Sequence, residues 1–202
     1  MGPRLRGDDK IPTILVTGFG PFPGAPHNPT EALVKRLGRE PAPRAARVVI
    51  NVFRTSYAAV DRELPALLRH HRPDALLMFG LATLAAHLRV ETLARNIVSP
   101  LADADGIVPE MRPIAPGRQA TLRLPTPVRQ LLAAAGAAHV KAMLSSDAGG
   151  YLCNYLCWRA AMAARLPHGP HLAAFIHVPA GQNPADLARA GRRFLAVVAR
   201  LV

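Results

Sequence analysis

Short apolar runs alternate along this chain with stretches whose apolar residues follow helical spacing. The runs rich in valine, isoleucine, leucine and phenylalanine predict buried strands, at residues 14–17, 48–53, 74–79, 140–144 and 172–178. Between them lie predicted helices, at residues 29–37, 57–68, 126–135, 150–165 and 186–201. The first helix carries its own start signal, because Asn28 suits the N-cap and Pro29 suits the first helical position.

Strands that are apolar throughout and separated by helices predict a parallel sheet covered on both faces. We therefore expect an α/β fold, a three-layer α/β/α domain with a mostly parallel central sheet. Residues 87–96 alternate more strongly between polar and apolar, which predicts a strand exposed on one side. Residues 98–119 contain four prolines and predict a loop. The sequence shows no repeat or linker, so we expect a flexible N-terminal segment over 1–11 and a single domain over 12–202.

Composition narrows the class of protein. Half of the 202 residues are apolar and 19% are charged, which excludes a disordered chain or a coiled coil. No apolar run reaches the ~18 residues of a membrane span, and the charged first ten residues lack a signal core, so we expect a cytoplasmic protein without membrane contact. The net charge of +12 comes mostly from scattered arginines without interleaved aromatic residues, so we expect no nucleic-acid partner.

Cys153 lies near the start of the helix predicted at 150–165, directly after a loop rich in serine and glycine. The positive end of the helix dipole favours a thiolate, which is the form that attacks carbonyl carbon atoms. A lone cysteine is otherwise a small buried apolar residue, and this second description suits Cys157, one turn deeper in the same helix. Cys153 is therefore the candidate nucleophile of a cysteine hydrolase.

His177 ends the last predicted strand, and Cys153 follows the strand before it. Ligands of such sheets bind beyond the carboxyl ends of the strands, so both residues belong at the same edge. A histidine there accepts the thiol proton, although a lone histidine is also commonly a structural hydrogen-bonding residue. Glu91 is the candidate carboxylate that orients His177, but its position in the fold does not follow from the sequence.

These local strings resemble those of pyroglutamyl peptidase I, the pyrrolidone-carboxylate peptidase family of cysteine peptidases. The likeness extends over about residues 12–200 and is carried by segments in the order of that family. They are Val16 to Gly24 followed by Asn28-Pro29, Val90-Glu91 with Asn96, Ser145 to Asn154, and Phe175 to Pro179. The strings around Cys153 and His177 are the most specific.

The resemblance implies hydrolysis of the amide bond after an N-terminal pyroglutamyl residue, through an acyl-enzyme. It makes Cys153 the nucleophile, His177 the proton acceptor and donor, and Glu91 the residue that orients His177. It further implies a substrate slot that includes Phe19, Phe22 and Asn28, pyroglutamylated peptides as substrates, no metal or cofactor, and a homotetramer. Phe19 and Phe22 could instead fill the loop, and Asn28 could serve only as a helix cap.

Two other functions are open at this point. A nucleotide binder would use Gly18-x-Gly20 after the first strand, but the fingerprint requires a third glycine where this chain has Pro23. A second alternative keeps the fold without the activity. Residues 81–86 and Ala180-Gly181 depart from the usual pattern of the family, so a weak or inactive homologue could bind a peptide or small molecule.

Overall fold

A computed structural model describes residues 11–43 and 46–202. Apart from Ile11, the segment predicted to be flexible lies outside the described residues. The strands are β1 (Thr13–Phe19), β2 (Arg47–Phe53), β3 (Ala75–Ala82), β4 (Leu88–Glu91), β5 (Leu93–Arg95), β6 (Thr121–Arg123), β7 (Ala142–Ser145) and β8 (Leu172–Pro179). The helices are α1 (Pro29–Leu37), α2 (Tyr57–His71), α3 (Val128–Ala137), α4 (Leu152–Ala163) and α5 (Pro184–Leu201).

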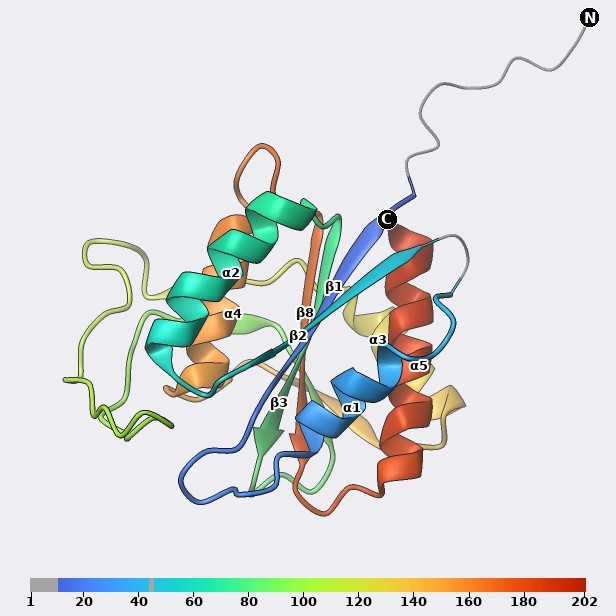
Figure 1. Cartoon of the computed structure of the whole chain (residues 1–202), viewed down its shortest axis with the longest axis horizontal. Coiled ribbons are helices and arrows are strands. Elements are labelled where there is room, and N and C mark those ends of the chain that lie inside the picture. Colours follow the sequence, from blue (N-terminus) through green and yellow to red (C-terminus); the bar gives the residue numbers. More distant parts are fainter. Residues whose placement is uncertain (1–10, 44–45) are drawn as a thin grey trace, which may run out of the picture.

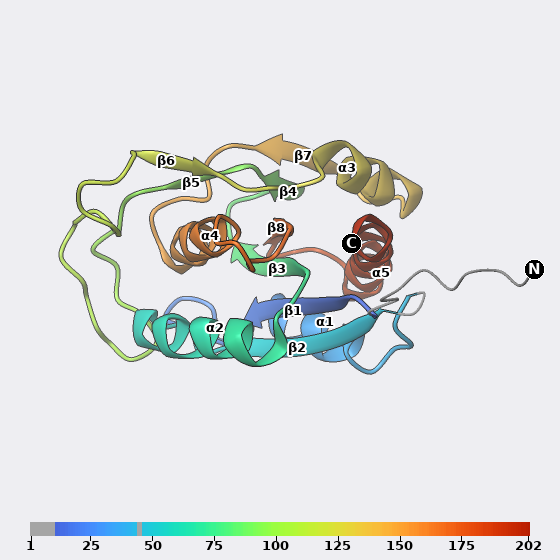
Figure 2. The ribbon, with the colours of Figure 1, turned by 90° about the horizontal axis from the view of Figure 1, so that it is seen from above.

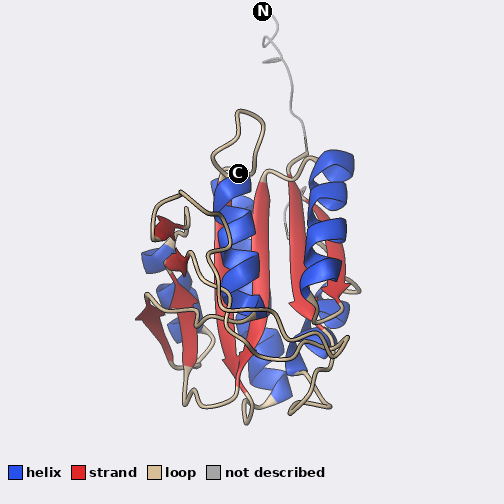
Figure 3. Ribbon diagram, turned by 90° about the vertical axis from the view of Figure 1, so that its left-hand side faces the viewer, coloured by secondary structure: helices blue, strands red, loops and turns tan. Residues whose placement is uncertain are grey.

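The central sheet has the strand order β2-β1-β3-β8-β4-β7. All of its neighbouring strands run parallel except β4 and β8, which are antiparallel. Helices cover both faces, with α1, α3 and α5 on one side and α2 and α4 on the other (Figures 1 and 3). The predicted three-layer α/β/α architecture with a mostly parallel sheet is therefore confirmed.

Residues 87–96 were predicted to form one strand exposed on one side, and this prediction is wrong. The chain breaks at Thr92, so that β4 belongs to the central sheet and β5 pairs with β6 in a separate antiparallel ribbon. The ribbon passes beside α4 (Figure 2). Leu88, Val90 and Glu91 are fully buried, because β4 lies between β8 and β7 rather than at an edge.

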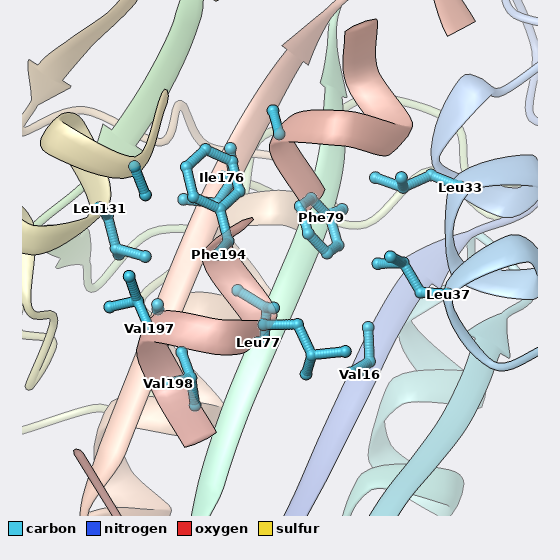
Figure 4. Packing of buried hydrophobic residues seen from close by; sticks show 14 of the residues in the cluster. Val16, Leu33, Leu37, Leu77, Phe79, Leu131, Ile176, Phe194, Val197 and Val198 are labelled. Atoms are coloured by element: carbon cyan, nitrogen blue, oxygen red, sulfur yellow. The ribbon is translucent and has the colours of Figure 1, made fainter. Parts of the chain in front are cut away.

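Two apolar clusters fill the spaces between the layers. Under α1, α3 and α5, side chains from β1, β3 and β8 meet the helix residues, as Figure 4 shows for Leu77, Ile176 and Phe194. The opposite cluster lies under α2 and α4 and contains Cys157 and Trp158. Because side chains alternate between the faces of a strand, this second face also receives Phe175 and His177 of β8.

Helix starts follow the sequence signals. The Asn28 side chain accepts a hydrogen bond from the Thr30 N–H at 3.1 Å, which confirms the predicted N-cap of α1. The Ser56 hydroxyl oxygen caps α2 by accepting from the Ala59 N–H at 3.2 Å. Asn183 caps α5 in the same way and precedes a proline at its first position. Each cap satisfies a backbone donor that the helix itself leaves unpaired.

The cluster around Phe194 generates a stability prediction. Phe194 is fully buried, so Phe194→Ala is expected to lower the free energy of unfolding by about 3–5 kcal/mol through lost burial and a residual cavity. Leu84 is 97% exposed, and Leu84→Ala is expected to change that free energy by less than about 0.5 kcal/mol. Urea unfolding followed by circular dichroism measures both, and equal effects would contradict this account of the core.

Candidate active site

The carboxyl ends of β3 and β8 meet the start of α4 on the face covered by α2 and α4. Gly80 of β3 is the register partner of His177 on β8. A Cβ atom at residue 80 would lie 2.6 Å from the Cys153 sulfur and 2.5 Å from Cζ of Phe175. The sulfur therefore rests against the bare backbone of Gly80, beside His177. The structure thus places Cys153 and His177 together at this edge of the sheet. The predicted shared edge assumed that the strand before Cys153 runs parallel to β8, and this assumption is wrong. β7 is parallel to β4, which is antiparallel to β8, so residues 146–151 carry the chain from the end of β7 to the start of α4.

Glu91 reaches His177 from the antiparallel neighbour of β8. In the register of these strands Arg89 is opposite His177 and Glu91 is opposite Phe175, so Glu91 lies diagonally across from the histidine on the same face. The imidazole Nδ1 and the Glu91 Oε1 atom are 2.8 Å apart. Glu91 is fully buried and His177 is 5% exposed, which removes this hydrogen bond from competition with water.

The proton affinity of His177 depends on its two neighbours. Burial lowers the pKa of His177, but the charge of Cys153, the hydrogen bond to it, and the Glu91 carboxylate together raise the pKa to about 9. The raised pKa favours the cationic form of the imidazole near neutral pH. Nδ1 is engaged by Glu91, which leaves Nε2 to face the sulfur. The sulfur, the imidazole and the carboxylate are thus neighbours in that order.

The two cysteines have opposite environments. Cys153 is half-buried at the second position of α4, whereas Cys157 is fully buried in the apolar cluster beneath it. Burial raises the pKa of the Cys157 thiol well above its ordinary value. A protonated, inaccessible thiol does not act as a nucleophile. The predicted division between a reactive Cys153 and a core Cys157 therefore agrees with their burial.

Asn154 fixes α4 to the strand that follows Glu91. Its fully buried side chain accepts from the Arg95 N–H at 2.7 Å and donates to the carbonyl oxygens of Arg95 and Ile97, at 2.9 and 3.1 Å. Gly149, with φ of 79°, turns the chain into this helix. The N-cap residue Tyr151 makes no side-chain hydrogen bond to the backbone N–H groups in the first turn of α4. The sequence did not predict this structural role of Asn154, although Asn154 directly follows Cys153.

The three predicted slot residues have different environments. Phe19 is 1% exposed and packs on Phe53 with ring centroids 5.9 Å apart, inside the cluster under α2 and α4. Phe22 is half-buried and lies against Tyr151, also with centroids 5.9 Å apart. The Asn28 amide donates to the Gly20 carbonyl oxygen at 3.0 Å in addition to capping α1. Phe22 is thus the member of the three nearest to the start of α4.

Two pockets lie at the amino ends of the strands. Arg72 lines both of them, with Arg47 in one and with His171 in the other, and neither is lined by Cys153, His177 or Glu91. Among residues 11–43 and 46–202, no group of three His, Cys, Asp or Glu side chains is placed to hold a metal ion. None of the helices formed by these residues combines the length and apolar character needed to cross a bilayer.

Comparisons with known proteins identify the family. The profile of the family described as Pyroglutamyl peptidase matches residues 12–188. The pyrrolidone-carboxylate peptidase of Halalkalibacterium halodurans is 37% identical over 178 residues, covering 85% of this chain and 86% of the relative. That of Thermococcus kodakarensis is 32% identical over 173 residues, covering 85% and 83%.

Solved structures agree with these sequence relatives. The pyrrolidone carboxyl peptidase from Thermococcus litoralis superposes with a TM-score of 0.86 at 28% identity, covering 95% of this chain and 94% of that one. The enzyme of the same name from Thermus thermophilus gives a TM-score of 0.81 at 33% identity, covering 91% and 98%. With its layered fold, its thiol at a helix start and these relatives, the chain belongs to the pyroglutamyl peptidase family.

Proposed function

We propose that this protein is a cysteine peptidase that hydrolyses the amide bond after an N-terminal pyroglutamyl residue. In this proposal Cys153 is the nucleophile, His177 is the general base and acid, and Glu91 orients His177. The observation that carries it is the contiguous arrangement of sulfur, imidazole and buried carboxylate, with Nδ1 and Oε1 2.8 Å apart. Membership of the pyroglutamyl peptidase family supports the substrate class.

The reaction follows from the roles of these groups. His177 takes the thiol proton, and the Cys153 thiolate attacks the acyl carbonyl carbon, whose π electrons move to oxygen. Collapse of this tetrahedral species breaks the carbon–nitrogen bond, and His177 gives its proton to the departing amine. Water then attacks the thioester while His177 accepts a proton. Pyroglutamate leaves, and the proton returns to the Cys153 sulfur, so the thiol is regenerated.

The surroundings of Cys153 suit this acyl group. Backbone N–H groups in the first turn of α4 would stabilise the oxyanion, since no side chain caps that turn. Phe22 and Tyr151 would form an apolar wall for the flat lactam ring, with Phe19 packed behind them. Asn28 would contribute indirectly, by holding the Gly20 carbonyl and so the shape of the aromatic loop.

Two further parts of the proposal concern the state of the protein. A reducing cytoplasmic location would keep the Cys153 thiol available for attack. Self-association into a homo-oligomer is supported by apolar side chains on the edge strand β7, where Met143 is 50% and Leu144 is 55% exposed. Sedimentation equilibrium tests this assembly, and a monomer at micromolar concentration would remove it from the proposal.

The central test uses a fluorogenic pyroglutamyl amide. The wild-type protein is expected to release the amine, and Cys153→Ala is expected to lower kcat by about 10⁴-fold or more, because loss of a nucleophile removes the covalent route. Cys157→Ala is the matched control and is expected to remain active. An inert wild type would contradict the peptidase and favour a binding module. Peptide mapping after iodoacetamide treatment is expected to find Cys153 modified and Cys157 protected by its burial.

The interaction between Cys153 and His177 predicts that the pKa of His177 changes when the sulfur is removed. In Cys153→Ala the contribution of the sulfur is lost while burial still lowers the pKa, so the pKa is expected to fall below the wild-type value of about 9. Two-dimensional NMR of the imidazole nitrogens against pH measures this difference. A pKa that stays the same in the variant would separate His177 from Cys153.

The raised pKa also gives the direction of a stability change with pH. The folded-state pKa of about 9 lies above the ordinary value of 6.5, so protonation of His177 favours the folded protein. That stabilisation is complete below about pH 6.5 and is lost as the pH rises through about 9. The corresponding loss is expected to be smaller in Cys153→Ala than in the wild type.

The contact between Gly80 and the sulfur predicts a sharp steric effect. A methyl group at residue 80 would overlap both Cys153 and Phe175, so Gly80→Ala is expected to displace the sulfur and reduce kcat by about 100-fold. Gly181→Ala adds the same methyl group where no atom lies within 4 Å and is expected to keep activity within about twofold. Steady-state kinetics and the iodoacetamide rate at Cys153 measure both variants, and full activity of Gly80→Ala would exclude this packing.

A further inference from the structure

Tyr57 lies opposite the start of the nucleophile helix. It is the first residue of α2, and its ring stands edge-on to Tyr151 and Tyr155, with centroids 6.2 and 5.0 Å away and interplanar angles of 89° and 88°. Tyr151 is the N-cap of α4 and contacts Phe22 of the aromatic loop. Tyr57 therefore belongs to the aromatic surroundings of Cys153, although it is 96 positions before that residue in the sequence.

The hydroxyl groups of these three tyrosines differ in whether they have a hydrogen-bond partner. Tyr151 donates to the Ala102 carbonyl oxygen at 2.9 Å, and Tyr155 donates to the Asp61 carboxylate at 2.9 Å. The Tyr57 hydroxyl is buried and has no hydrogen-bond partner among the described residues. Buried hydroxyl groups in folded proteins are nearly always paired. A bound molecule that carries an acceptor at this position would remove the exception.

The nearby carboxylate does not serve as that acceptor. Asp103 is 2% exposed, and its Oδ2 atom accepts from the Tyr57 backbone N–H at 3.2 Å. Its Oδ1 atom accepts from the N–H groups of Asp105 and Ile107, at 2.9 and 3.1 Å. Asp103 thus fixes the backbone at the start of α2 and leaves the phenol to another partner. The hydrogen bond from the Tyr57 N–H to Asp103 therefore holds the backbone of Tyr57, while the Tyr57 hydroxyl remains unpaired.

The protonation state of Tyr57 makes it a hydrogen-bond donor. Burial raises the pKa of its hydroxyl above the ordinary value, and Tyr151, Asp103, Tyr155 and Cys153 add to the rise. The phenol therefore keeps its proton throughout the pH range in which a thiolate acts.

We infer that the Tyr57 hydroxyl donates a hydrogen bond to the lactam carbonyl oxygen of the acyl group bound at Cys153. This inference rests on the proposed function. The lactam ring is small and flat, and it carries one carbonyl acceptor that an apolar slot alone would leave unpaired. A protonated phenol beside the slot complements that acceptor. Tyr57 is thus a specificity-determining residue, which separates a pyroglutamyl group from a carbocycle of the same size.

The test removes one oxygen atom and keeps the ring. Tyr57→Phe is expected to lower kcat/KM for a fluorogenic pyroglutamyl amide by about tenfold, mainly through KM. The cyclopentanecarbonyl amide of the same amine lacks the lactam groups, and its kcat/KM is expected to change by less than about twofold. The iodoacetamide rate at Cys153 is expected to be unaltered, because neither the sulfur nor His177 is touched.

Tyr155→Phe is the matched control, because it removes a tyrosine hydroxyl of the same cluster that is already paired with Asp61. It is expected to leave the preference for the pyroglutamyl amide unchanged. Equal losses in Tyr57→Phe and Tyr155→Phe, or an equal loss on both substrates, would show that Tyr57 acts through packing and would overturn the inference. Unchanged kinetics in Tyr57→Phe would overturn it as well.

A measurement without turnover separates this inference from the proposed function. The lactam 2-pyrrolidone is expected to protect Cys153 of the wild type from iodoacetamide, with about tenfold weaker protection in Tyr57→Phe. If the wild type does not cleave the pyroglutamyl amide but shows this difference in protection, the proposed function fails and the lactam contact stands. If protection is equal in the two proteins, or absent in both, the inference is overturned.

Discussion

The hydrogen bond between Glu91 and His177 is the interaction on which the site depends. A carboxylate without access to water is stabilised only by close partners, and its Oε1 atom lies 2.8 Å from the imidazole Nδ1. The second oxygen of Glu91, Oε2, has no hydrogen-bond partner among the described residues. The contact with His177 is therefore the main stabilisation of this buried carboxylate. The bond also determines which imidazole nitrogen faces the sulfur. Removing either partner would leave a buried group without compensation.

The fold makes this bond by reversing two strands, because β4 and its parallel neighbour β7 run opposite to β2, β1, β3 and β8. The carboxyl ends of β4 and β7 therefore point toward the opposite edge of the sheet from those of β3 and β8. Because β4 is antiparallel to β8, Glu91 enters the sheet two residues away from the register partner of His177 and on the same face. Asn154 then ties α4 to the chain just beyond Glu91. Cys153 and Glu91 are thereby held by one set of contacts with the backbone.

Aromatic residues surround this polar core and give it an apolar setting. Phe175 packs against the His177 imidazole at 5.0 Å, and Tyr151 links the start of α4 to Phe22 and Tyr57. Such surroundings exclude water and strengthen the electrostatic interactions among the groups inside. They also make each unpaired hydrogen-bond donor a candidate for contact with the substrate, which is the basis of the role inferred for Tyr57.

The sequence by itself determined the layered fold, the cap at Asn28 and the apolar position of Cys157. These features follow from local periodicity and from capping signals, which involve only residues near one another in the sequence. Tertiary structure alone decided the break at Thr92, the directions of β4 and β7, and the approach of Cys153 to His177. It also decided the contacts of Gly80 and Tyr57 with the site. Glu91 and His177 are 86 positions apart, and their meeting depends on strand order and register. Long-range pairing is selected by the packing of the whole sheet, so no local pattern in residues 87–96 could reveal it.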